Sequence, residues 1–163
     1  MDVCGIDPGI HTSGYAVVRA EGACLSVLDA GVCRTDAGAD LPHRVAQIEA
    51  DFAAIFEQWP VETVAVEQLY AHYKHPRTAV LMGHARGVII ATASRFGFAV
   101  RDYSATQIKR FLTGNGHASK AQVQSAVMGA FGLQRVPEPN DVADALATAY
   151  CCIHAVRQEA VAP

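Results

Sequence analysis

The chain has 163 residues, of which 51% are hydrophobic and 18% charged, and its formal net charge is -3. These values describe a globular chain with a core of its own and exclude a disordered or fibrous protein, so we expect one domain spanning residues 1–163. Its longest apolar run, Gly87 to Ala93, is too short to cross a membrane. The 5 cysteines are odd in number and have no CxxC spacing, which argues against a disulfide framework and a zinc site.

The first half of the chain predicts three strands, a helix and a fourth strand. The strands at about 2–7, 14–20 and 24–34 are separated by short turns with glycine, which favours an antiparallel meander. Helical spacing of apolar residues then predicts a helix over 41–58, followed by Pro60. Residues 61–67, VETVAVE, alternate as a strand does.

The second half is mainly helical. Pro76 begins a long apolar helix to about Arg95, a short strand follows at 98–103, and three helices are expected at about 105–112, 119–131 and 140–155. The order predicts an α/β fold: a five-stranded mixed sheet, made of the three-strand antiparallel meander plus two parallel strands, flanked by helices.

Two acidic residues stand at strand ends. Asp7 ends the first strand, before Pro8 and Gly9, and Glu67 ends the fourth. If these strands are parallel neighbours joined by the helix at 41–58, both carboxylates leave the sheet at the same edge, where sites gather in such folds. The alternative for Asp7 is a purely conformational role in the turn that Asp-Pro and Pro-Gly steps favour.

Two more acidic residues begin the last helix. Asp141 and Asp144 are three residues apart in PNDVADALATAY and therefore share a face of its first turn. The helix dipole alone also favours acids there. Four converging carboxylates would repel one another unless cations join them, and Mg²⁺ prefers carboxylate oxygens. Two such ions can activate a water and stabilise the leaving oxygen of a phosphodiester.

Charge is distributed unevenly along the chain. Residues 1–70 hold 3 basic and 11 acidic residues, whereas residues 71–120 hold 8 basic residues and 1 acid, Asp102. The asymmetry suggests a basic surface for a polyanion. The alternative is a solvated mixture spread over several helix faces.

Five motifs together identify a family resemblance. GIDPG (5–9), VEQLY (66–70), GHARGV (83–88), QIKRFLTGNGHASKAQVQ (107–124) and DVADALATA (141–149) resemble the RuvC family in order and at compatible spacing. These are bacterial Holliday junction resolvases with a ribonuclease-H-like fold, and the similarity spans essentially the whole chain.

The resemblance implies roles for particular residues and partners. Asp7, Glu67, Asp141 and Asp144 are expected to be catalytic and to bind Mg²⁺ or Mn²⁺, with two ions per active site. Lys109 and Lys120 are expected near the scissile backbone of branched DNA. A homodimer would nick two strands of a four-way junction symmetrically, and the RuvA–RuvB branch-migration complex is a possible partner.

The loop after Glu67 is a candidate DNA contact. Tyr70 stands where the family commonly has Phe, and the resemblance implies stacking on an opened base, although packing against the loop is the alternative. Lys74 and Arg77 add positive charge, so we expect both to bind DNA. His72 and His75 depart from the family pattern, and neither they nor His117 is assigned a role.

The helix at 76–95 has a face of small residues. Gly83 and Gly87 share one side with Ala79, Val80, Ile90 and Ala91. Either a partner subunit or the chain's own sheet could pack there; the resemblance favours a partner.

The leading hypothesis is therefore a metal-dependent endonuclease specific for branched DNA. A sugar-kinase or actin-like ATPase would need a second lobe, and residues 114–120, GNGHASK, lack the ending of a phosphate-binding P-loop. A catalytically silent junction-binding module would not need four acids. The first residues, MDVCGID, resemble no signal peptide, so we expect a cytoplasmic protein.

Overall fold

The computed structural model describes residues 1–69 and 76–161. Five strands form one sheet in the order β3-β2-β1-β4-β5. The strands β1 (Asp2–Asp7), β2 (Thr12–Glu21) and β3 (Cys24–Arg34) form the antiparallel meander, while β4 (Thr63–Glu67) pairs in parallel with β1, and β5 (Ala99–Tyr103) with β4. The predicted mixed sheet is confirmed, including the parallel pairing of the first and fourth strands.

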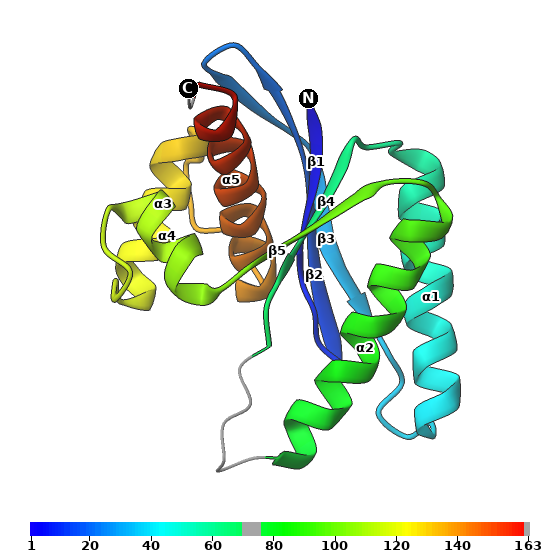
Figure 1. The fold of residues 1–163 in the computed structure, drawn as a ribbon. Coiled ribbons are helices and arrows are strands. Elements are labelled where there is room, and N and C mark those ends of the chain that lie inside the picture. Colours follow the sequence, from blue (N-terminus) through cyan, green and yellow to red (C-terminus); the bar gives the residue numbers. More distant parts are fainter. Residues whose placement is uncertain (70–75, 162–163) are drawn as a thin grey trace.

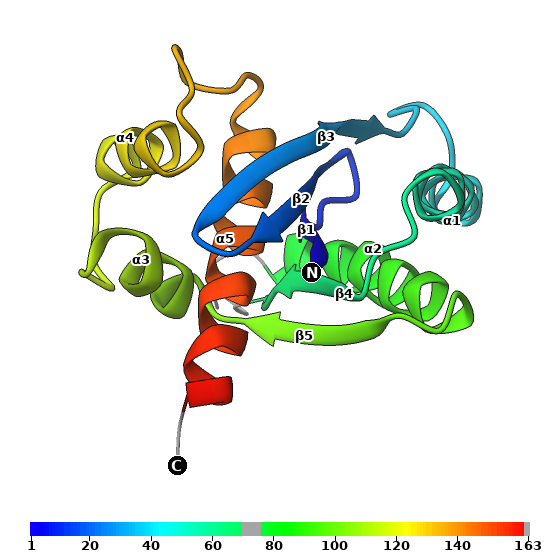
Figure 2. The ribbon, with the colours of Figure 1, turned by 90° about the horizontal axis from the view of Figure 1, so that it is seen from above.

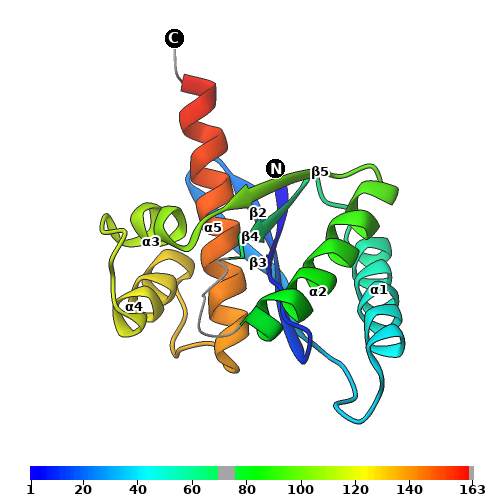
Figure 3. The same ribbon diagram turned by 60° about the horizontal axis from the view of Figure 1, so that its bottom comes forward.

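Helices cover both faces of this sheet (Figures 1 and 2). The helices α1 (Leu41–Gln58) and α2 (Pro76–Arg95) lie on one side. On the other side are α3 (Ala105–Thr113), α4 (Lys120–Phe131) and α5 (Asn140–Val161), with α3 and α4 beside α5 (Figure 3). This is the ribonuclease-H-like arrangement that the motifs predicted.

Strand alternation divides the core into two halves. Val3 and Ala65 contribute to the half beneath α5, together with Leu146 and Ile153 of that helix. Their neighbours, such as Val64, point to the opposite half, which α1 and α2 close with aliphatic and aromatic residues. Because successive side chains of a strand alternate between faces, the last residue of each strand has a defined side.

Caps set the ends of α3 and α4, the two helices that carry the lysines of interest. Ser104 and Ser119 each form a capping box with a glutamine three residues later. Gly114 and Gly132 end the helices in the left-handed conformation, at φ 77 and 63, which glycine adopts without strain. As a result, Lys109 lies in the second turn of α3 and Lys120 is the first residue of α4.

The predicted element boundaries differ from the observed ones mainly at two places. β2 begins at Thr12, because Thr12 pairs with Arg34 of β3. The last helix continues to Val161, where Glu159 pairs with Arg101 of β5 at 2.8 Å. Among the described residues, no helix has the length and apolar character needed to cross a membrane. All 5 cysteines are free, and four of them are buried.

Candidate active site

Asp7 and Glu67 end two neighbouring parallel strands. The register runs from Val3 with Thr63 to Ile6 with Val66, so the next positions, Asp7 and Glu67, lie side by side. Two residues earlier, Gly5 and Ala65 lie beneath α5. By alternation, both carboxylates therefore leave the sheet on the face that α5 covers.

Two glycines let the backbone of α5 lie directly on the sheet. A Cβ at Gly5 would be 2.2 Å from the carbonyl oxygen of Ala145, and one at Gly14 would be 2.1 Å from that of Asp141. Any side chain at either position would push the helix away. This close packing brings the first turns of α5, with Asp141 and Asp144, to the edge where β1 and β4 end.

The four acidic residues act on one another electrostatically. Burial, followed by the charges of Glu67, Asp144 and Asp141, raises the pKa of Asp7 to about 8. Burial and the charge of Asp144 raise the pKa of Glu67. The pKa of Asp144 is raised by burial and by Asp141. The acids from β1, β4 and α5 therefore lie near enough to influence one another in a partly dehydrated place.

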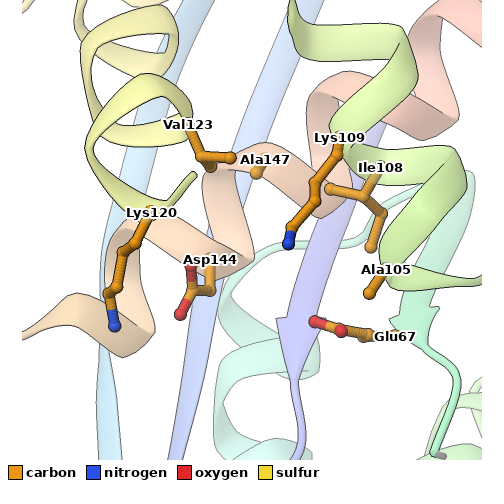
Figure 4. Close-up of a pocket in the computed structure, with 8 residues that line it drawn as sticks. All are labelled: Glu67, Ala105, Ile108, Lys109, Lys120, Val123, Asp144 and Ala147. Carbon is orange, nitrogen blue, oxygen red and sulfur yellow. The ribbon is translucent and has the colours of Figure 1, made fainter. Parts of the chain in front are cut away.

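Two lysines partly offset this negative charge. Lys120 lowers the pKa of Asp7 and of Asp144, and Lys109 lowers the pKa of Glu67 and of Asp144. Both lysines line a pocket of about 260 Å³ together with Glu67 and Asp144. Figure 4 shows the amino group of Lys109 directed into the space between Glu67 and Asp144, and Lys120 on the other side of Asp144.

Glu67 also borders a second hollow of about 160 Å³. Asp7, Pro8 and Gln68 line this hollow together with Ala79 and Met82 of α2. Because the two hollows share Glu67 and Ala105, the acidic edge is continuous from Asp7 to Asp144.

The donor set fits a hard divalent cation. It consists of carboxylate oxygens, and the raised pKa of Asp7 shows that the protein alone does not compensate their charge. Within residues 1–69 and 76–161, no group of at least 3 His, Cys, Asp or Glu side chains is close enough to enclose an ion. The chemistry of the donors is what fits Mg²⁺, which prefers carboxylate oxygens, keeps several waters and takes one or two carboxylates from a protein.

The described basic residues of the segment 71–120 differ in their surroundings. Lys109 and Lys120 line the pocket, and Arg77 is exposed in the first turn of α2. Three other arginines of this segment form ion pairs elsewhere: Arg86 with Asp102, Arg95 with Glu49, and Arg101 with Glu159. These ion pairs agree with the mixed alternative for the three arginines, and the basic surface stays a prediction.

Two predicted DNA contacts lie outside the described residues, and His117, which is assigned no role, is exposed. Tyr70 and Lys74 belong to the segment 70–75, of which nothing is described. His117 is exposed between α3 and α4, where its backbone N–H donates to Asn115 Oδ1 at 2.9 Å.

Sequence reasoning overlooked the residues that shape the loop after Asp7. Ser13 and Arg44 are both buried and hydrogen-bond to that loop. One signal was available for Arg44: it stands four residues before Ile48 and so continues the buried stripe of α1 as its only charged member.

Comparison with known proteins places the chain in a family. Residues 3–152 match RuvC, described as Crossover junction endodeoxyribonuclease RuvC. The protein of that name from Rhodopirellula baltica is 47% identical over 149 residues, which cover 91% of this chain and 84% of the relative. That of Heliobacterium modesticaldum is 40% identical over 156 residues and covers 96% of each.

A solved structure agrees with these relatives. Thermus thermophilus RuvC in complex with Holliday junction substrate superimposes with a TM-score of 0.92 at 34% identity, covering 98% of this chain and 96% of the other. The sequence and the fold thus give the same assignment over nearly the full length, and the chain belongs to the RuvC family of crossover junction endodeoxyribonucleases.

Proposed function

We propose that this chain resolves four-way (Holliday) DNA junctions in homologous recombination and repair, as a single nuclease domain over residues 1–163. It hydrolyses phosphodiester bonds with divalent ions bound by Asp7, Glu67, Asp141 and Asp144. The proposal takes its substrate from the Thermus relative solved with a Holliday junction and its chemistry from the acidic site. The relatives are bacterial, and bacterial chromosomes lie in the cytoplasm, so we expect this chain to act there.

The convergence of acids from three separate segments carries the proposal. Asp7, Glu67 and Asp144 come from β1, β4 and α5, and the pKa of each is raised by burial and by neighbouring carboxylates. A stable core gains nothing from such repulsion, because like charges in a dehydrated place oppose folding. A cation and a phosphate would relieve it.

The protein's own groups would hold the substrate and orient the reaction. The carboxylates would bind Mg²⁺ or Mn²⁺, two ions per site, and these ions supply an activated water and stabilise the leaving oxygen. Lys109 and Lys120 attract the phosphodiester to the pocket, since each is a compact charge on a flexible stem. Arg77, Lys74 and Tyr70 would contact the DNA further along, with the ring of Tyr70 suited to stacking on a base.

Two active sites are needed to nick two strands symmetrically. Within residues 1–69 and 76–161, nothing covers part of α2: Val80 is 61% exposed, and a Cβ added at Gly83 or Gly87 would meet nothing within 4 Å. A second copy packing there would form a two-fold dimer on a two-fold substrate. Ile90 packs against the chain's own core, so of the face considered, Val80, Gly83 and Gly87 are the residues we propose for the partner. From the family resemblance we also expect this chain to bind a RuvA–RuvB complex.

A synthetic four-way junction tests the function. Asp7→Asn removes one carboxylate charge without changing the size of the side chain, and we expect it to abolish Mg²⁺-dependent cleavage while junction binding persists. Asp51→Asn is the matched control, because Asp51 is a half-buried acid of α1 on the opposite side of the sheet. Undiminished cleavage by Asp7→Asn would refute the site.

A further inference from the structure

Arg44 is a buried cation in an unfavourable place. It is 8% exposed and shares the buried face of α1 with Ile48, Phe52 and Phe56. Among the described residues its guanidinium forms no ion pair. Burial without a counter-charge and the positive end of the helix dipole both disfavour an arginine there. Some specific interaction must offset these costs.

The guanidinium binds the loop that follows Asp7. Its Nη2 donates to the carbonyl oxygen of Ile10 at 2.9 Å and lies 2.7 Å from His11 Nδ1. Because a guanidinium only donates, His11 Nδ1 is the acceptor. Its Nε donates to Thr35 Oγ1 at 3.0 Å, and that hydroxyl donates in turn to the same Ile10 carbonyl at 2.6 Å.

The near end of the loop is held by a second side chain. Ser13 Oγ accepts from the backbone N–H of Gly9 at 3.0 Å and donates to the Gly9 carbonyl at 2.8 Å. The backbone N–H of Thr35 donates to the carbonyl of His11 at 3.1 Å. The loop between β1 and β2 is thus fastened at three successive residues directly after Pro8.

We infer that Arg44 is a positioning residue that holds the loop after β1, and through it Asp7, in the geometry needed to bind a divalent ion. The inference rests on the proposed function, because it takes Asp7 to be a metal ligand. Only two residues, Pro8 and Gly9, separate Asp7 from Ile10, whose carbonyl Arg44 binds, and Ile10 is itself buried. The rigid fork of a guanidinium fixes several acceptors at once, which a lysine amine cannot do.

Mg²⁺ binding without DNA tests this role directly. Arg44→Met keeps the length of the side chain but loses every donor, and Arg44→Lys keeps the charge but loses the fork. The readout is the Mg²⁺ concentration that gives half of the maximal rise in melting temperature of the full chain. Substituting a residue that supports a metal ligand typically weakens metal affinity by about 10–100-fold. We therefore expect both variants to need an at least roughly tenfold higher Mg²⁺ concentration for the half-maximal rise.

The matched control is Ile48→Val, which weakens the same buried stripe but removes none of the hydrogen bonds that hold the loop. It should lower the melting temperature but keep the wild-type Mg²⁺ response. Wild-type Mg²⁺ binding by the Arg44 variants, or an equal change in Ile48→Val, would overturn the inference. If Arg44→Met does not fold, Arg44→Lys alone decides. A wild-type response in Asp7→Asn would instead contradict the proposed metal site.

Discussion

We expect Asp7 to make the stability of the metal-free protein depend on pH. Its pKa is raised from 3.8 to about 8, so between about pH 4 and pH 8 the unfolded chain releases a proton that the folded chain keeps. The free energy of unfolding must therefore fall as pH rises through this window and stay highest below it. Asp7→Asn removes the titration, and we expect its melting temperature at pH 8 to exceed that of the wild type by roughly 5 °C.

Thermal unfolding from pH 4 to pH 8 in a chelator measures this effect. Added Mg²⁺ should raise the melting temperature of the wild type most at pH 8 and change that of Asp7→Asn little. Glu57→Gln, at an exposed position of α1, is the control and should keep the wild-type slope. Glu67 and Asp144, whose pKa values are also raised, should keep a smaller slope in Asp7→Asn. A slope as steep as that of the wild type would contradict the role of Asp7.

Lys120 combines two actions that substitution can separate. Its charge lowers the pKa of Asp7 and Asp144, and it lines the pocket expected to receive the phosphate. We expect Lys120→Met to slow single-turnover cleavage by roughly 100-fold, as removal of a donor to developing negative charge does. The slope of log binding affinity against log salt concentration should become shallower by about one, the amount expected for one lost phosphate contact. Lys120→Arg should retain the salt dependence, and a Met variant that cleaves at the wild-type rate would exclude the role.

At the scale of elements, the contact between α5 and the sheet determines whether the acids converge. Gly14→Ala would place a Cβ 2.1 Å from the carbonyl oxygen of Asp141, so the helix or the strand must shift. We expect a loss of about 1–3 kcal/mol in the free energy of unfolding and, for a displacement of about 1 Å, a roughly 100-fold loss of cleavage. Urea unfolding and junction cleavage measure the two effects.

Gly129→Ala in α4 is the matched control for that change. A Cβ there meets nothing within 4 Å, so this substitution should stabilise the helix by about 0.5–1 kcal/mol and leave cleavage intact. If Gly14→Ala and Gly129→Ala cleave the junction equally well, the close packing of α5 on the sheet is not needed for cleavage.

This contact also shows where sequence-based prediction stops. Strand alternation and the parallel crossover sufficed to place Asp7 and Glu67 on one edge, because both depend on local periodicity and chain order. The approach of α5 depends on Gly5 and Gly14, whose missing side chains matter only once a partner helix lies over them. Likewise, sequence clustering did not reveal that Arg86 and Arg95 are occupied by Asp102 and Glu49, since those partners are 16 and 46 residues away.

At the scale of the whole molecule, the charge is arranged around one end of the sheet. The acids of β1, β4 and α5 meet there, and lysines of α3 and α4 enter the same pocket from the helices. The helix α2 begins beside the second hollow through Ala79 and Met82, and its outward residues face solvent. A dimer formed through α2 would therefore place its interface next to both active sites and couple assembly to the spacing of the two cuts.

Val80→Asp tests that assembly. Because Val80 is 61% exposed, a carboxylate there leaves the fold of the single chain intact, but in a dimer it would be buried without a partner. We expect the dissociation constant of the dimer, measured by analytical ultracentrifugation, to rise at least about tenfold, which corresponds to about 1.4 kcal/mol. Paired nicking of one junction should fall in proportion to the lost dimer, while nicking of a single strand persists. Ala54→Asp, at an exposed position of α1, should change neither quantity. A Val80→Asp protein that remains dimeric and cuts both strands together would place the interface elsewhere.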